Sequence, residues 1–236
     1  MRRTVLFALV VVAGCRSGGP GSAARRLAAF LPDDAIVLAG ADLDAVRAAP
    51  LGRDLPTLAW LAPLGVEAHD VLASWDGRTW LVAARGRLTA PPAPGLAAAG
   101  DVVVAGPPEA VRAAMERARA GRPGPAALLA RAPRTQLWAV STGAPMVPSN
   151  SAYARLLNAV GDITAEADFS AGLRLRASGT CRDESNAQTV AGALRAIFAL
   201  ARVADATVEQ RGAAVRLAAG LSPEEARKLL DRLSPR

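Results

Sequence analysis

The sequence has 236 residues, of which 51% are hydrophobic, 4% aromatic and 21% charged. This length is enough to form a hydrophobic core and corresponds to one or two domains. The moderate charged fraction and the high apolar content exclude a disordered polyelectrolyte. Two cysteines and one histidine exclude a disulfide scaffold and metal sites that are built from several cysteines or histidines.

The chain is basic, with 28 Lys and Arg residues against 21 Asp and Glu residues and a formal charge of +7. Its single lysine is Lys228, and the arginines are scattered among acidic residues along the whole chain. Nucleic-acid-binding proteins usually cluster basic residues on one face and add aromatic platforms for single strands. We therefore expect no nucleic-acid partner.

The first 15 residues have the organisation of an export signal. Arg2 and Arg3 form a basic start, and the uncharged run VLFALVVVA follows over residues 5–13. A membrane-spanning helix needs about 20 apolar residues, so this run has the length of a signal-peptide core instead. Aliphatic and small residues then precede a cysteine: Val12, Ala13, Gly14, Cys15.

These four residues resemble the lipobox of bacterial lipoproteins, and the resemblance covers residues 1–15 only. It implies that the signal is cut before Cys15, that the Cys15 thiol carries a diacylglycerol and that the new amine is acylated. Arg16 follows in place of the Asp that retains such proteins in the inner membrane, which favours the outer membrane. The alternatives are a secretory signal cut near 21–24 and an uncleaved anchor.

The resemblance and the composition together divide the chain into four parts. The signal peptide is 1–14, and residues 15–24 are the lipidated cysteine and a flexible Gly/Ser-rich tether. Residues 25–133 and 134–236 are predicted to form a first and a second α+β module.

In the first module, the Asp76-Gly77 pair between two extended runs predicts a hairpin whose two turn positions both have positive φ. Pro107 and Gly121 are typical of the two ends of a helix. The expected elements in chain order are a short helix from 25, a strand at 35–41, two helical pieces within 43–62, strands at 71–75 and 79–88, a Pro-rich loop at 89–98, a strand at 102–105 and a helix at 107–120.

In the second module, residues 163–169 and 173–177 alternate apolar and polar side chains, which indicates a hairpin with one buried face. Acidic residues on one strand and arginines on the other are expected to pair across its open face. Ser185 with Gln188, and Ser222 with Glu225, fit capping boxes. The expected elements are a strand at 136–141, a helix at 151–160, the hairpin, a helix at 185–202 whose apolar stripe includes Val190, Leu194, Ile197, Phe198 and Ala201, strands at 207–210 and 214–219, and a final helix from Pro223.

Both modules follow a similar order of elements. The hairpin at 71–88 corresponds to 163–180, and residues 101–118 correspond to 213–230. The pattern favours an α+β fold with two ferredoxin-like modules, each an antiparallel sheet with helices packed on one face. One continuous sheet through both halves is the alternative.

Two side chains are candidates for chemistry. His69 with its neighbour Asp70 could form a general base, and Cys181 lies beside Arg182 at a helix start, where a thiol pKa is lowered. The alternatives are a surface histidine and a small packed cysteine. No relay, phosphate-binding loop or metal-ligand spacing accompanies them, so we expect no catalytic residue, no metal site and no cofactor.

Residues 135–154 carry no charge, and their prolines prevent one continuous helix. Because loops often carry function, we expect a binding surface in this loop, formed by Thr142, Pro145, Met146, Pro148 and Asn150.

We expect a membrane-anchored, non-catalytic lipoprotein that binds an envelope protein partner. One alternative is a carrier or sensor of a lipid or small apolar ligand, which requires an apolar cavity. The other is a secreted enzyme in which Cys181 and His69 meet in a cleft.

Overall fold

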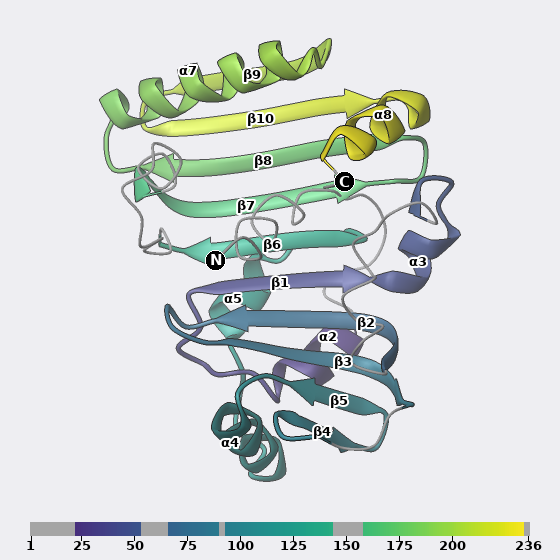
Figure 1. Ribbon diagram of the computed structural model, residues 1–236. Helices are drawn as coiled ribbons and strands as arrows, with labels where there is room; N and C mark the ends of the chain where they lie inside the picture. The colour runs from purple at the N-terminus through teal and green to yellow at the C-terminus, as the bar shows by residue number, and fades with distance from the viewer. Residues whose placement is uncertain (1–21, 53–65, 90–92, 144–157, 234–236) are drawn as a thin grey trace.

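The computed structural model describes residues 22–52, 66–89, 93–143 and 158–233. In these residues, ten strands form one antiparallel sheet in the order β4-β5-β3-β2-β1-β6-β7-β8-β10-β9 (Figure 1). The continuous sheet that the sequence left as an alternative is therefore the arrangement found, within an α+β fold.

The predicted order of elements holds over most of the described chain. The first half contains α2 (Ser22–Ala28), β1 (Val37–Asp42), α3 (Leu43–Ala48), β2 (Val66–Trp75), β3 (Trp80–Leu88), β4 (Leu96–Ala99), β5 (Val102–Ala105), α4 (Pro108–Arg119) and α5 (Ala126–Arg131). The second half contains β6 (Leu137–Thr142), β7 (Val160–Asp168), β8 (Leu173–Cys181), α7 (Glu184–Ala201), β9 (Asp205–Arg211), β10 (Ala214–Leu221) and α8 (Pro223–Leu233).

The two halves repeat one strand order on either side of the β1–β6 pair. Counting outward from that pair, β1, β2, β3, β5 and β4 correspond to β6, β7, β8, β10 and β9. Ala39 and Ala139, each the third residue of its strand, pair directly. Val71 pairs with Ala41, and Ile163 pairs in the same way with Ser141, so the first strands of the two hairpins align as the sequence predicted. The second strands do not, because Val71 pairs with Ala84 whereas Ile163 pairs with Gly179 and not with Arg176.

The ferredoxin-like modules are not confirmed. Such a module contains two split βαβ units. Here β8, α7 and β9 form one split unit with β10 inserted between the strands. The other helix-linked pair, β1 and β2, are direct antiparallel neighbours.

The two faces of the sheet can be followed through residues that pair across neighbouring strands, because paired residues point to the same side. One side, here called the α2 face, carries the row Leu72, Gly40, Trp138, Glu166 and Arg176. The opposite side, here called the α7 face, carries the row Val71, Ala41, Leu137, Ala167 and Leu175.

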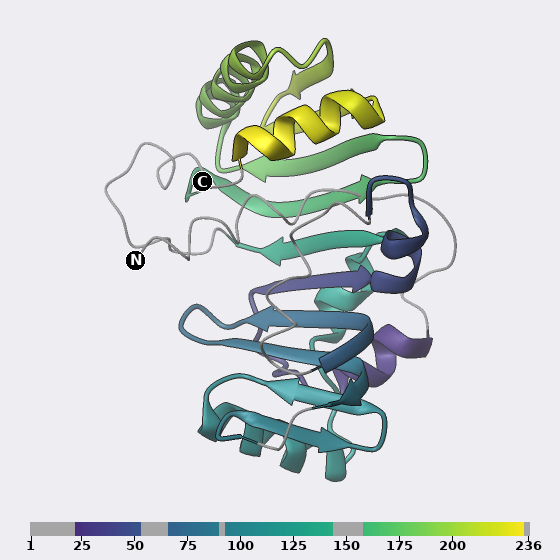
Figure 2. The same cartoon turned by 45° about the vertical axis from the view of Figure 1, so that its right-hand side comes forward.

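Helices cover different faces in the two halves (Figures 1 and 2). On the α2 face of the first half, α2, α4 and α5 bury a cluster that includes Leu27, Leu38, Leu72, Val104, Val111 and Leu128. On the α7 face of the second half, α7 and α8 bury two clusters that include Val190, Val215, Ala167, Phe169 and Ala226. A smaller buried cluster that includes Val71 and Ala84 lies on the α7 face of the first half. The first half is therefore buried on both faces, and in the described residues the helical cover of the α2 face ends near the middle of the sheet.

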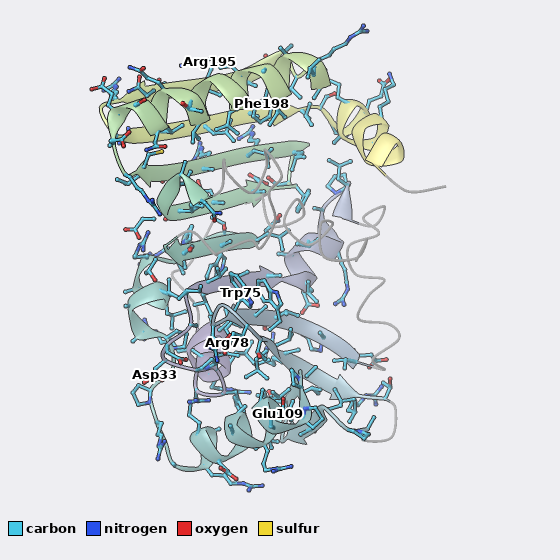
Figure 3. All side chains as sticks on the ribbon, turned by 60° about the vertical axis from the view of Figure 1, so that its left-hand side comes forward. Asp33, Trp75, Arg78, Glu109, Arg195 and Phe198 are labelled. Atoms are coloured by element: carbon cyan, nitrogen blue, oxygen red, sulfur yellow. The ribbon has the colours of Figure 1, made fainter. Side chains whose placement is uncertain are left out.

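The turn of the first hairpin differs from the prediction. Gly77 has φ of +100°, but Asp76 does not have a positive φ. Its carboxylate instead accepts hydrogen bonds from the backbone N–H groups of Arg78 at 2.8 Å and Thr79 at 2.7 Å, which closes the turn. Trp75 and Trp80 stack at this end of the hairpin with ring centroids 5.8 Å apart, and Figure 3 labels Trp75 and Arg78.

The start of α7 also differs from the prediction. Asp183, not Ser185, is its N-cap, and its side chain accepts from the backbone N–H of Asn186 at 2.7 Å. The predicted capping box of α8 is confirmed, because Ser222 N donates to Glu225 Oε2 at 2.8 Å and Glu225 N donates to Ser222 Oγ at 3.3 Å.

Four further differences concern short segments and exposure. Strand β4 begins within the loop expected at 89–98, and α5 was not predicted. Val160, expected at a helix end, begins β7. Ile197, expected in the apolar stripe of α7, is exposed because the helix turns that side away from the strands.

Candidate functional site

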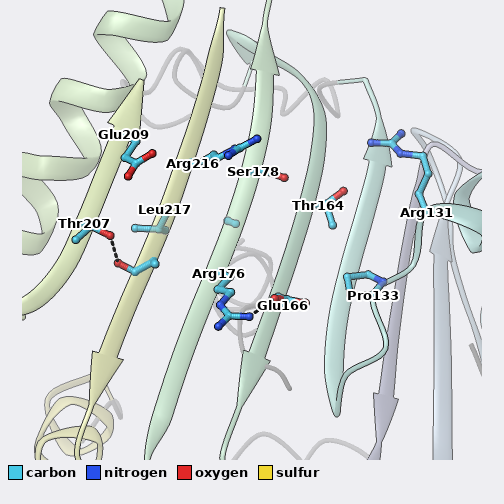
Figure 4. A pocket seen from close by; sticks show the side chains of 12 residues that line it. Arg131, Pro133, Thr164, Glu166, Arg176, Ser178, Thr207, Glu209, Arg216 and Leu217 are labelled. Carbon is cyan, nitrogen blue, oxygen red and sulfur yellow. Dashed lines mark hydrogen bonds and ion pairs between the residues drawn. The ribbon is translucent and has the colours of Figure 1, made fainter. Parts of the chain in front are cut away.

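The α2 face continues past β6, and in the described residues no helix covers it over the second half of the sheet. We call this surface the polar face and define it by the outward side chains of β7, β8, β9 and β10: Thr164, Glu166, Arg174, Arg176, Ser178, Thr207, Glu209 and Arg216. Figure 4 shows all of them except Arg174. Each of these residues alternates with an apolar or small residue that points to the α7 face. The same period of two that builds the core therefore builds the polar face.

The polar face is hollowed beside the point where the helical cover of the first half ends. A depression of about 510 Å³, open to solvent, lies over β7, β8, β9 and β10. Arg131, the last residue of α5, and Pro133 form its wall on the side of the first half (Figure 4). The depression thus lies where the helices that cover the α2 face end and the uncovered strands of the second half begin.

Charged side chains on the polar face are only loosely paired. Arg176 Nη1 lies 3.6 Å from Glu166 Oε1, which confirms the predicted pairing between β7 and β8. Glu209 Oε2 lies 3.8 Å from Arg211 Nη2 on its own strand. Pairs this long and this open to water contribute little to stability.

The predicted pairing is wrong at the other end of the same hairpin. Asp168 lies opposite Arg174 in register, but its side chain is buried and accepts from the backbone N–H of Ser170 at 2.6 Å and from the Ser170 hydroxyl. Within the described part of the chain, the side chains of Arg174 and Arg216 make no hydrogen bond and no ion pair. Two guanidinium groups of the polar face are therefore available to a ligand.

Most of the binding loop expected from the sequence cannot be compared with the structure. Thr142 is exposed at the end of β6, where its backbone N–H donates to Ile36 O at 3.1 Å. The remaining predicted residues lie outside the described residues: Pro145, Met146, Pro148 and Asn150 of the loop, and Val12, Ala13, Gly14 and Cys15 of the lipobox.

His69 is half-exposed on β2, and its carboxylate partner is not its neighbour in sequence. His69 Nδ1 lies 2.9 Å from Asp44 Oδ2 of α3. Asp70, the expected partner, instead accepts from Arg85 Nε at 2.5 Å. Arg47 Nη1 lies 3.2 Å from Asp44 Oδ1, so the carboxylate of Asp44 is shared between an imidazole and a guanidinium.

Cys181 is buried at the end of β8, in the cluster beneath α7. Burial raises the pKa of its thiol, and the negative charge of Asp183 raises the pKa further. A helix start and Arg182 had suggested a lowered pKa; loss of hydration outweighs both because the sulfur packs against apolar side chains. The small packed cysteine is the interpretation that fits these surroundings.

Cys181 and His69 do not meet in the structure. Strands β1, β6 and β7 separate β2, which carries His69, from β8, which carries Cys181. In the described residues, no group of three or more His, Cys, Asp or Glu side chains is placed to hold a metal ion. Those residues also contain no helix with the length and apolar character needed to cross a membrane.

Sequence reasoning identified the alternation that makes the polar face but assigned no site to it. The signal was present, since acidic, hydroxyl and arginine side chains share one parity over 163–169, 173–180 and 214–219. Only the strand order brings these segments side by side.

No known protein-family model matches the chain, and no curated protein matches it. A solved structure titled "Structure of crystal form I of TP0453" is similar, with 12% sequence identity and a TM-score of 0.46 over 89% of this chain and 97% of that chain. A likeness at this level carries no argument about the function of this chain.

Proposed function

We propose that this chain is a bacterial lipoprotein of the cell envelope whose body binds a protein partner without catalysing a reaction, and that the polar face is the binding surface. The observation that carries the proposal is the uneven cover of one sheet face. Three helices bury the α2 face in the first half, whereas the second half presents charged and hydroxyl side chains there.

The composition of the polar face supports a protein partner. Arginine is enriched in protein–protein interfaces, and hydrogen-bonding groups supply their specificity. Strands hold the arginines and hydroxyls of the polar face on a rigid framework, so little backbone conformational entropy is lost on binding. An open surface of this kind suits a macromolecule better than an enclosed small ligand.

The lipid anchor is supported by the lipobox-like residues 12–15. Residues 16–21, which link Cys15 to α2, can span at most about 20 Å when fully extended. A diacylglycerol and a further acyl chain provide stable anchoring. The body would then remain close to the periplasmic surface of the membrane. We propose the outer membrane because Arg16 follows the cysteine.

The two alternative functions receive less support. A carrier of an apolar ligand requires an enclosed apolar cavity, but the depression on the polar face is open to solvent, and charged and hydroxyl side chains line it together with Pro133 and Leu217. The enzyme alternative requires Cys181 and His69 in one cleft, and they lie on strands separated by three others.

Two measurements on the protein in its own cells test the proposal. The denatured mass of the membrane-extracted protein is expected to equal residues 15–236 plus a diacylglycerol and an acyl chain, and Cys15→Ser should release the chain from the membrane. An unmodified mass would contradict the anchor.

Binding is tested with a photo-crosslinking residue at Ser178, in the centre of the polar face. The matched control carries the same residue at Arg112, on the exposed side of α4. We expect a discrete crosslinked protein from position 178 and none from position 112. Equal crosslinking from both positions, or none from either, would contradict a partner on the polar face.

A further inference from the structure

Three arginines of the polar face lie at successive levels along the strands. Arg174 and Arg176 are two residues apart on β8, and Arg216 of β10 pairs with Ser178, two residues further along. Residues two apart on a strand lie roughly 7 Å apart on the same face. The three guanidinium groups therefore originate at regular steps along one direction of the sheet.

Acidic side chains on the polar face do not neutralise this row. Glu166 lies 3.6 Å from Arg176, but Arg174 and Arg216 make no ion pair within the described residues. Glu209 lies opposite Arg216 in register, yet its carboxylate is near Arg211 instead. Two of the three cations thus retain their full capacity to bind an anion.

The spacing of the row selects the shape of the anion. Guanidinium groups that originate about 7 Å apart along a strand can each bind a separate carboxylate. In an extended polypeptide, side chains at positions i, i+2 and i+4 repeat with that same spacing on one side. Ser178, Thr164 and Thr207 beside the row offer hydroxyl groups to the backbone of such a segment.

We propose that the polar face binds an extended acidic segment of a protein partner, with acidic side chains at every second residue opposite Arg174, Arg176 and Arg216. This inference rests on the proposed function, since it assigns the chemistry of the partner to the same surface. A single-stranded nucleic acid is disfavoured because the residues lining the depression include no aromatic side chain on which a base could stack.

The test is fluorescence anisotropy with the full chain in detergent and labelled synthetic peptides. The probe alternates Glu and Thr over seven residues, and a second peptide has the same composition with its Glu residues contiguous. We expect the alternating peptide to bind roughly tenfold more tightly than the contiguous one, because only the alternating peptide matches the row when extended.

The variant Arg174→Glu with Arg216→Glu should weaken binding of the alternating peptide by at least about tenfold. Both side chains are exposed, so the fold should be retained, and the milder pair Arg174→Gln with Arg216→Gln provides a second variant. The matched control is Arg112→Glu with Arg119→Glu on α4, which makes the same change in net charge on exposed positions. This control should change binding by less than about twofold, since both sites lie on the other half of the molecule.

Several outcomes would overturn the inference. Equal affinity for the two peptides, or equal loss in the variant and the control, would indicate attraction by net charge alone. Tighter binding of a single-stranded oligonucleotide or of anionic lipid vesicles, lost in the same variant, would replace the peptide with another polyanion. If no peptide binds while Ser178 still crosslinks a protein, the acidic segment is wrong and the proposed binding function stands.

Discussion

The two halves of this molecule use one strand arrangement, but in the described residues helices bury the α2 face only in the first half. In the first half, Leu72 of β2 pairs with Ala83 of β3, and both are fully buried beneath helices. At the corresponding positions of the second half, Thr164 of β7 pairs with Ser178 of β8, and both face the open depression. The same strand arrangement thus accommodates an α2 face that is buried by helices and one that is open to solvent. The side chains on that face determine which of the two occurs.

The helices follow the apolar side chains rather than the symmetry of the strands. α4 and α8 occupy corresponding places after β5 and β10, yet they pack on opposite faces. Val111 of α4 joins the cluster around Val104, whereas Ala226 of α8 joins the cluster around Ala167. Burial of apolar surface is the dominant stabilising contribution, so polar residues occupy the α2 face of the second half, which no described helix covers.

The largest expected effect contrasts two corresponding positions on the α2 face. Leu72→Ala should lower the free energy of unfolding by about 3 kcal/mol, because it leaves a cavity beneath the helices. Thr164→Ala should change it by less than about 0.5 kcal/mol, because the hydroxyl faces solvent. Urea denaturation of both variants measures the contrast. Similar losses would show that the second half also buries this face.

The next effect concerns Gly40, where the covered half has no space for a side chain. A Cβ at Gly40 would lie 2.4 Å from carbon atoms of the buried Trp138 ring, which belongs to the second half. We expect Gly40→Ala to cost about 2 kcal/mol through overpacking. The control is Gly192→Ala on α7, where no atom lies within 4 Å of the new Cβ, and it should stabilise the helix by about 0.5 kcal/mol. Thermal denaturation distinguishes the two, and the same sign for both would refute this account.

A smaller effect is expected at the caps of the helices on the α7 face. Ser222→Ala should destabilise the protein by about 1 kcal/mol by removing the cap of α8. Ser185→Ala should have almost no effect, because Asp183 caps α7. Hydrogen bonds from the Ser222 hydroxyl and backbone hold the pKa of Glu225 below its ordinary value of 4.5.

This pKa shift gives the cap a dependence on pH. A folded-state pKa below the unfolded value stabilises the protein above about pH 4.5, and this contribution disappears as the pH falls through the folded pKa. The stability difference between the wild type and Ser222→Ala should therefore shrink below pH 4.5. Chemical denaturation as a function of pH measures it, and a difference that grows in acid would contradict the sign.

The smallest effect is expected from the ion pair on the polar face. Glu166→Gln should change the free energy of unfolding by less than about 0.5 kcal/mol, because Arg176 is largely exposed. A double-mutant cycle with Arg176→Gln measures the coupling between the two side chains. A coupling well above 1 kcal/mol would assign the polar face a structural role in place of a binding one.

Much of the fold could be predicted from the sequence because local signals were strong. The alternation over 163–169 and 173–177, Pro107 before α4 and the Ser222–Glu225 capping box each mark an element that the structure contains. β4 was missed because prolines beside it indicate a loop, and its four residues form a strand only by pairing with β5. The N-cap of α7 was predicted at the wrong residue because Asp and Ser are both favourable N-caps. The helix begins at Glu184, so Asp183 and not Ser185 is its N-cap.

The site was harder to predict than the fold. The sequence predicted Asp70 as the carboxylate partner of His69, but α3 places the carboxylate of Asp44 beside the imidazole instead. The polar face is formed by four strands that are distant in sequence, and its lining includes Arg131 from the end of α5. No local pattern contains this information, since it depends on which strands become neighbours.

The sequence by itself determined the spacing of apolar residues along each helix and strand, the positions of the hairpin turns and the two faces of each strand. These features depend on residues that are close together in the sequence. It also carries the lipobox-like residues that motivate the proposed anchor. Only the tertiary structure decided that the two halves share one sheet through Ala39 and Ala139, and that the helices of the described chain cover the α2 face in the first half alone. These features depend on the total apolar area that distant segments bury together, and that sum is fixed only when the chain is folded.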